Sequence, residues 1–146
     1  RDLHSFPTRR SSDLVVDFTA AILLLVGLYI GNRASVGIGP RARNEIVMRS
    51  KNFIRRLNRH DYEACYAAMN EDMTKSMSLS RVKETFVPVL DALGDFNAFR
   101  SASVSRRDVD EIKRIACSVK CEYDNGNAVF TILFDPSFRI AGLSIK

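Results

Sequence analysis

The sequence predicts an α+β fold, with an N-terminal apolar segment followed by three helices packed on an antiparallel sheet of about four strands. Up to Gly94, apolar residues recur every three or four positions, which is the period of an amphipathic helix. Beyond Gly94 they alternate with polar residues, which is the period of a strand, and turn-forming residues separate the alternating runs. Helices followed by strands in one short chain favour helices packed on one face of a sheet.

The first fourteen residues are excluded from this fold. Back-translation of RDLHSFPTRRSSDL resembles a sequencing adapter read in one frame, so we interpret residues 1–14 as adapter-derived sequence ahead of a bacterial, metagenomic fragment. Arg9 and Arg10 therefore cannot count as an export signal, and His4 cannot count as a ligand. The rest of the chain keeps 19 basic and 15 acidic residues, a mildly basic balance.

Residues 15–31 are predicted to be a transmembrane anchor or signal segment. The stretch FTAAILLLVGLYI at 18–30 carries no charge, and a bilayer span needs about 20 apolar residues. A buried core helix is the alternative. The Gly-containing residues 32–41 are read as a linker, and residues 42–146 as the α+β domain. The positive-inside rule compares both flanks of a span, so it leaves the orientation open here.

Three helices are expected in the first half of the domain. The first follows Pro40 and presents a basic outer face; the second begins after Asp61 as its N-cap; the third begins at Ser80 and ends at Gly94. Pro88 should kink or split the third helix. The apolar stripes of these helices are, in order, Ile46, Phe53, Ile54 and Leu57; Tyr62, Cys65, Tyr66 and Met69; Val82, Phe86, Val89, Leu90 and Leu93.

Four strands are expected after the helices, and their turns have recognisable sequences. Asp-Asn-Gly-Asn at 124–127 is typical of a hairpin turn, and Asp-Pro-Ser at 135–137 turns the chain once more. The strands themselves are predicted at residues 97–105, 115–123, 128–134 and 138–145.

Three stretches of the chain resemble the DUF3887 family. They are FIRRLNRHDYEACYAAMNEDMTKSMSLSRV at 53–82, LGDF at 93–96 and FDPSFRIAGLSI at 134–145, of which the last is the most specific. The resemblance implies an NTF2-like or cystatin-like fold in an exported or membrane-anchored protein. The apolar segment lacks a lipobox cysteine, so lipid anchoring is not implied. Some similar proteins also carry a hydrolase domain, but no G-x-S-x-G motif occurs here, so no hydrolase activity is carried over.

Cysteine and histidine side chains offer little chemistry in this sequence. Cys117 and Cys121 would lie about 13 Å apart on one strand face, too far to bridge each other. A disulfide from Cys65 to either is an alternative to three small buried hydrophobic residues. A zinc site built from these cysteines and His60 is disfavoured by the spacing. Asp61 is committed as a helix cap beside His60, so we assign no catalytic residue, no metal and no cofactor.

The predicted function is a non-catalytic, extracytoplasmic binding or interaction module. Folds of this kind often enclose a pocket between helices and sheet, and a small isomerase or lyase that uses buried acid and base groups there is the alternative. The candidate pocket-lining residues are Tyr66, Met73, Phe86, Cys121 and Tyr123.

The expected partners follow from charge and hydropathy. Arg55, Arg56 and Arg59 are candidate contacts with an anionic membrane surface, with a simply solvated helix face as the alternative. The basic residues are too few and too scattered to predict nucleic-acid binding. We therefore expect a protein at the cell membrane whose domain lies outside the cytoplasm, with an unknown small molecule, a protein or a second copy of the chain as its partner.

Overall fold

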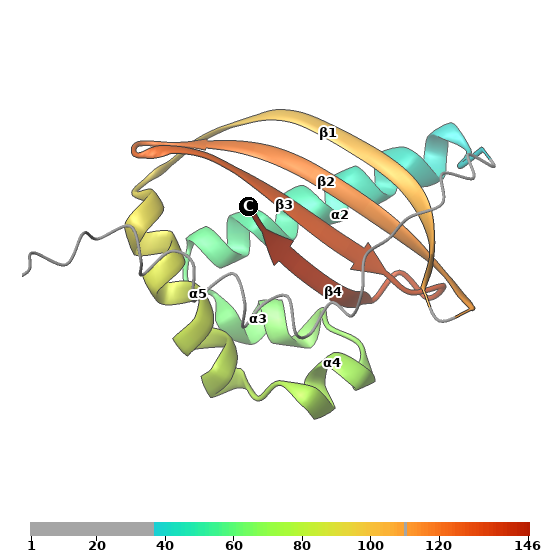
Figure 1. Ribbon diagram of the computed structural model, residues 1–146, viewed down its shortest axis with the longest axis horizontal. Coiled ribbons are helices and arrows are strands. Elements are labelled where there is room, and N and C mark those ends of the chain that lie inside the picture. The colour runs from blue at the N-terminus through green and yellow to red at the C-terminus, as the bar shows by residue number, and fades with distance from the viewer. Residues whose placement is uncertain (1–36, 110) are drawn as a thin grey trace, which may run out of the picture.

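Four helices precede four strands in the computed structural model, which describes residues 37–109 and 111–146 (Figure 1). The helices are α2 (Pro40–Asn58), α3 (Tyr62–Ala67), α4 (Glu71–Ser76) and α5 (Leu79–Leu93). The strands are β1 (Phe96–Val109), β2 (Ile112–Tyr123), β3 (Gly126–Phe134) and β4 (Ile140–Ile145). The predicted α+β order of helices followed by an antiparallel sheet is confirmed.

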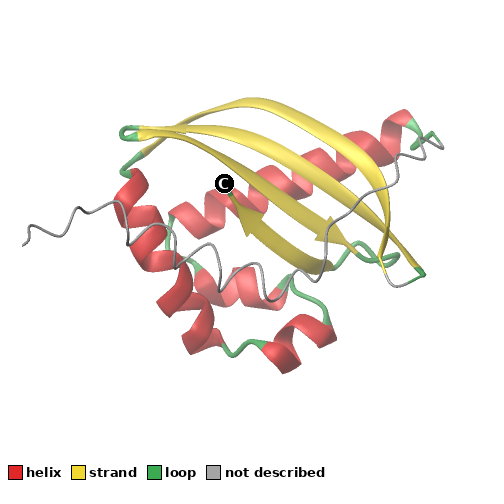
Figure 2. Ribbon diagram, viewed as in Figure 1, coloured by secondary structure: helices red, strands yellow, loops and turns green. Residues whose placement is uncertain are grey.

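The sheet has the order β1-β2-β3-β4, and every neighbouring pair is antiparallel. Register shifts near Asn97 and Arg100 bulge β1, and such bulges bend a strand and increase its twist. In Figure 2 the curved sheet arches over α2, and α3, α4 and α5 lie together beyond β4. The helices and the inner face of the sheet therefore enclose one core.

Alternation along the strands builds this core. On β2 the side chains of Cys117, Val119 and Cys121 are fully buried, and each pairs with an inward residue of β3. The apolar stripe of α2 covers them from the other side, as its period predicts. Ser50 is the one buried polar residue among those described, and its hydroxyl donates to the Ile46 carbonyl oxygen at 2.8 Å.

The helices differ from the prediction in number and in one cap. α4 was not expected, because it buries no residue fully and so lacks an apolar stripe; Asn70 caps it by accepting from the Met73 amide at 3.0 Å. The second helix ends at Ala67, short of Met69. Ser78, and not Ser80, caps α5 by accepting from the Arg81 amide at 3.3 Å.

Pro88 does not split α5, which runs as one helix from Leu79 to Leu93. A proline removes one amide donor from a helix and frees the carbonyl one turn earlier. Because Pro88 is exposed, water can satisfy that carbonyl. The sequence pattern also underestimated β1, which continues past the predicted end at Ser105 to Val109.

The predicted anchor at residues 15–31 lies outside the described residues, as does the first half of the predicted linker, residues 32–36. α2 already begins at Pro40, so the last residues assigned to the linker are helical. Within residues 37–109 and 111–146, no helix is long and apolar enough to cross a membrane.

Candidate ligand-binding cleft

The end of α2 forms a Schellman motif that presents His60. The Asp61 amide donates to the Arg56 carbonyl at 3.0 Å, and the His60 amide donates to the Leu57 carbonyl at 3.1 Å. His60 occupies the left-handed position of this motif, with φ of +59°. Glycine usually fills that position, and a side chain there is strained by about 1–2 kcal/mol. A strained non-glycine residue at a helix end points to a local use for its side chain.

The imidazole of His60 is held by Tyr62. Its Nδ1 lies 2.8 Å from the Tyr62 hydroxyl, and the two rings are tilted by 58°. Burial, and then the nearby Asp91 carboxylate, raise the pKa of Tyr62. Tyr62 therefore keeps its proton, and the direction of its hydrogen bond with His60 depends on the imidazole tautomer. As the sequence predicted, Asp61 caps α3, accepting from the Ala64 amide at 3.3 Å.

The opposite side of this region is the junction between α5 and β1, the LGDF segment. Gly94 ends α5 at the predicted position, and its amide donates to the Leu90 carbonyl at 3.1 Å. Its φ of +78° and ψ of −160° differ from the left-handed helical conformation that was predicted for this cap. Asn125 of the β2–β3 turn donates from its backbone to the Leu93 carbonyl at 3.0 Å and from its side chain to the Ala92 carbonyl at 3.1 Å. These bonds fix the junction to the sheet.

Between the two sides lies a cleft of about 700 Å³. Its lining divides by chemistry into donors on α2 and the turn after it, carboxylates on α5 and the start of β1, and apolar groups at the base. The donors are Arg55, Asn58, Arg59 and His60; the carboxylates are Asp91 and Asp95; the apolar groups are Leu90 and Phe96. A few polar groups converging on a concave, partly apolar surface are typical of a small-molecule site.

An aromatic cluster positions the donors on α2. The guanidinium of Arg55 lies 5.1 Å from the centre of the Phe99 ring, and Phe99 in turn packs on Phe96 at 4.8 Å between ring centres. Asn58 donates to the Tyr123 hydroxyl at 3.0 Å and to the Ile54 carbonyl at 2.8 Å. Burial raises the pKa of Tyr123 to about 12, so this hydroxyl stays neutral.

The five predicted pocket residues do not line this cleft. Phe86, Cys121 and Tyr123 belong to the core, and Met73 is half-buried against it. Tyr66 lines a second depression of about 720 Å³. Pattern analysis favoured apolar residues on helix and strand faces, whereas the cleft is built from polar residues near the ends of elements.

The three arginines predicted to contact a membrane lie in different surroundings in the structure. Arg55 and Arg59 line the cleft, and Arg56, although exposed, does not. Residues four apart share a helix face, whereas neighbours in sequence do not. Arg55 and Arg59 are therefore placed at the cleft, and Arg56 projects from another side of α2.

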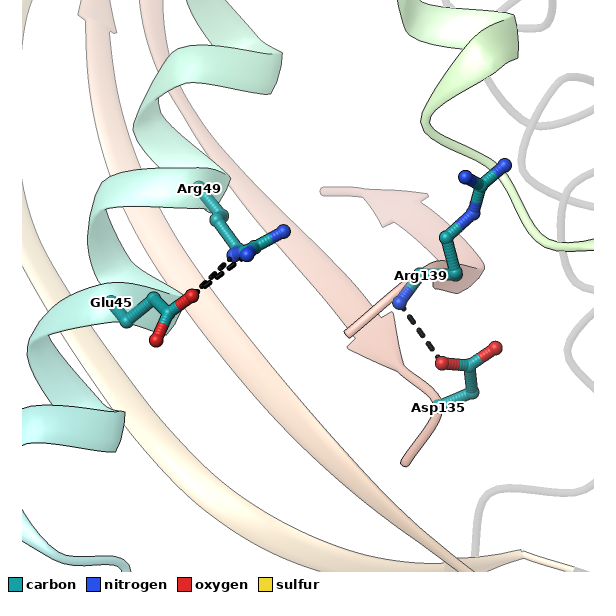
Figure 3. Close-up of polar contacts among 4 residues, drawn as sticks. All are labelled: Glu45, Arg49, Asp135 and Arg139. Carbon is teal, nitrogen blue, oxygen red and sulfur yellow. Dashed lines mark hydrogen bonds and ion pairs between the residues drawn. The ribbon is translucent and has the colours of Figure 1, made fainter. Parts of the chain in front are cut away.

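In the second depression, at the β3–β4 turn, the charged lining residues Asp135 and Arg139 form hydrogen bonds within the fold. The guanidinium of Arg139 donates to the carbonyls of Ala67 and Met69 at 2.8 and 2.7 Å, which satisfies the end of α3. The Asp135 carboxylate accepts from the backbone amides of Ser137 and Arg139, both at 2.9 Å. Figure 3 shows the second of these bonds. The specific FDPSFR motif thus serves the fold.

Figure 3 also shows the ion pair between Glu45 and Arg49 on α2, with 2.7 Å between nitrogen and oxygen. Arg49 additionally lies over the Phe138 ring, at 5.7 Å from its centre. This arginine is therefore engaged with the turn after β3, away from the cleft.

The three cysteines are free thiols, and all are buried. Burial raises the pKa of Cys65 to about 12 and that of Cys121 to about 11, which keeps both protonated at neutral pH. No disulfide joins Cys65 to the sheet. In the part of the chain that the structure describes, no group of residues could hold a metal ion. The buried side chains described there include no carboxylate or imidazole, the groups that the alternative pocket enzyme would need.

Comparison with known proteins gives a family match and a solved structure of similar fold. The family model described as "Protein of unknown function (DUF3887)" matches residues 50–143, which include both sides of the cleft. An NMR structure of a protein from Ruminococcus gnavus ATCC 29149 is similar, with a TM-score of 0.61 and 16% sequence identity over 78% of this chain and 96% of that chain. At this identity the likeness concerns the fold alone. No curated protein matches the sequence.

Proposed function

This chain belongs to the DUF3887 family, and on that premise we propose that its domain is a non-catalytic binding module whose small-molecule ligand occupies the cleft between α2 and α5. The proposal includes a tether, with residues 15–31 anchoring the chain and the domain on the extracytoplasmic side of the membrane. We also propose that the domain is related to the NTF2-like or cystatin-like folds.

One observation supports the binding role most strongly. The cleft is lined by charged side chains of both signs on separate elements, and among the described residues no ion pair joins Arg55 or Arg59 to Asp91 or Asp95. All four belong to exposed residues, for which pairing with one another would add little stability. Left apart, they are available to a ligand.

Amide chemical shifts of the full chain in a nonionic detergent test this role. We expect a mixture of charged amino acids, short peptides, carboxylates and phosphate esters to shift the amides of Asn58, His60 and Gly94. Arg59→Gln should reduce the shifts, whereas Arg56→Gln, on the same helix but outside the cleft, should leave them unchanged. Absence of shifts at these amides, or an equal effect of the two variants, would refute the binding role.

The tether proposal needs a separate experiment. Each Arg or Lys at an anionic surface contributes about 1 kcal/mol, so contact through Arg55, Arg56 and Arg59 should depend on lipid charge. In nanodiscs that contain a paramagnetic headgroup lipid, we expect broadening of the last turn of α2 with anionic lipid and less with neutral lipid. Equal broadening in both, or in a variant with all three arginines changed to glutamine, contradicts the surface contact.

A further inference from the structure

The charges of the cleft are arranged in two groups. Arg55 lies in the last turn of α2, and Arg59 is the C-cap residue that follows the helix. Asp91 lies in the last turn of α5, and Asp95 follows the Gly94 cap. All four line the same cleft. Cationic and anionic groups therefore enter it from different elements.

Neither group is neutralised by its surroundings. The ion pairs of the described residues are Glu45–Arg49, Glu71–Lys75, Glu63–Lys83 and Arg100–Glu122, and none involves the cleft. The Arg55 guanidinium donates to the Asn52 side-chain oxygen at 3.0 Å and lies over the Phe99 ring, and both of these partners are uncharged. For the Arg59 guanidinium the structure gives no hydrogen bond or ion pair within the described chain.

We propose that the cleft binds a small zwitterion, namely a free amino acid or a short peptide with both termini free. Its carboxylate is held by Arg55 and Arg59, and its ammonium group by Asp91 and Asp95. The inference rests on the binding role proposed above and assigns the class of its ligand.

The chemistry of each group supports this assignment. Guanidinium groups bind carboxylates through paired, charge-assisted hydrogen bonds, and carboxylates accept from all three ammonium hydrogens. Phe96 and Leu90 provide an apolar surface for a ligand side chain. A cleft of about 700 Å³ falls within the range of small-molecule sites.

Ligands of one charge fit less well. A simple anion such as phosphate would meet Arg55 and Arg59 but also approach Asp91 and Asp95, and a polyamine would meet the reverse conflict. Like charges brought close together disfavour binding, and this repulsion is a common source of specificity. The two carboxylates therefore select against the anions that the arginines alone would attract.

Five probes, namely four amino-acid or dipeptide compounds and inorganic phosphate, test the assignment on the full chain in dodecyl maltoside, with amide chemical shifts as the readout. Phenylalanine and the dipeptide Ala-Phe are zwitterions, N-acetyl-Ala-Phe retains only the carboxylate, and Ala-Phe amide retains only the ammonium group. We expect at least one zwitterion to shift the amides of His60, Asp91 and Gly94, and each blocked dipeptide to bind about tenfold more weakly than Ala-Phe, the scale of one lost charged hydrogen bond. Inorganic phosphate should bind more weakly still.

Variants assign the two ends of the ligand. Asp91→Asn should weaken Ala-Phe about tenfold and leave N-acetyl-Ala-Phe unchanged, whereas Arg59→Gln should weaken Ala-Phe and leave Ala-Phe amide unchanged. Arg56→Gln is the matched control and should change none of them. Equal binding of N-acetyl-Ala-Phe or phosphate would overturn the zwitterion while leaving a binding site in place. Absence of shifts with all probes would overturn it too, and the broader ligand mixture then decides whether the binding role survives.

Discussion

Replacing Gly94 by alanine should destabilise the domain by about 2 kcal/mol. With φ of +78° and ψ of −160°, Gly94 lies in a region that essentially only glycine occupies, and a side chain there is strained by about 1–3 kcal/mol. The added methyl group would also lie 3.1 Å from the Asp124 Cβ and 3.2 Å from the Asn125 side-chain nitrogen, so the β2–β3 turn must shift. That shift weakens the hydrogen bonds of Asn125, each worth about 0.5–1.5 kcal/mol. Reduced freedom of the unfolded chain offsets about 0.5 kcal/mol.

Thermal and urea unfolding followed by circular dichroism measure this loss. For a domain of this size, about 2 kcal/mol corresponds to a decrease of about 10 °C in Tm. Two other glycines separate the contributions. Gly126→Ala has φ of +147° but open space, so it isolates backbone strain, and Gly37→Ala has neither problem and should be neutral. If Gly94→Ala costs no more than Gly126→Ala, the contacts with the turn relax freely and the reasoning is wrong.

Three further outcomes are expected. The free energy of unfolding of His60→Gly should exceed that of His60→Ala by about 1 kcal/mol, because only glycine relieves the left-handed strain. Its urea midpoint should therefore be higher, and equal midpoints would contradict this. Burial raises the pKa of Cys65 to about 12, that of Cys121 to about 11 and that of Tyr123 to about 12, so the folded state holds these protons more tightly than the unfolded chain does. Burial of these protonated groups should therefore contribute fully to stability below about pH 9, and this contribution should fall as the pH rises towards 11. A urea midpoint that is the same at pH 8 and pH 10.5 would show that burial does not raise these pKa values. Arg139→Ala should cost about 1–3 kcal/mol in the same assay by leaving two carbonyls of the α3 end without their donor, and a loss below 0.5 kcal/mol would show that water replaces it.

The parts of the fold that the sequence predicted are those where burial follows a regular period. β2 is an example, because Cys117, Val119 and Cys121 alternate with polar residues and all face the helices. Gly94 and Asp61 were predicted as caps for a similar reason, since their residue types satisfy local backbone geometry whatever the rest of the chain does.

The cleft could not be predicted in this way. Asp91 lies on α5 and His60 in the turn after α2, and only tertiary packing brings them to one place. Arg55 and Arg59 were recognised as a basic face, but a helical pattern cannot distinguish a face that lines a cleft from one that is fully solvated. α4 was missed because a short helix without a buried stripe leaves no periodic signal.

The attachment of the α5–β1 junction to the β2–β3 turn has a consequence for binding kinetics. Asn125 and Asp124 make hydrogen bonds to Leu93 and Asp95, so the acidic side of the cleft cannot move independently of the sheet. The backbone on the acidic side of the cleft is therefore held in place before the proposed ligand binds. Association then carries little entropic cost from ordering the protein, and selectivity among ligands should appear mainly in how long each one stays bound.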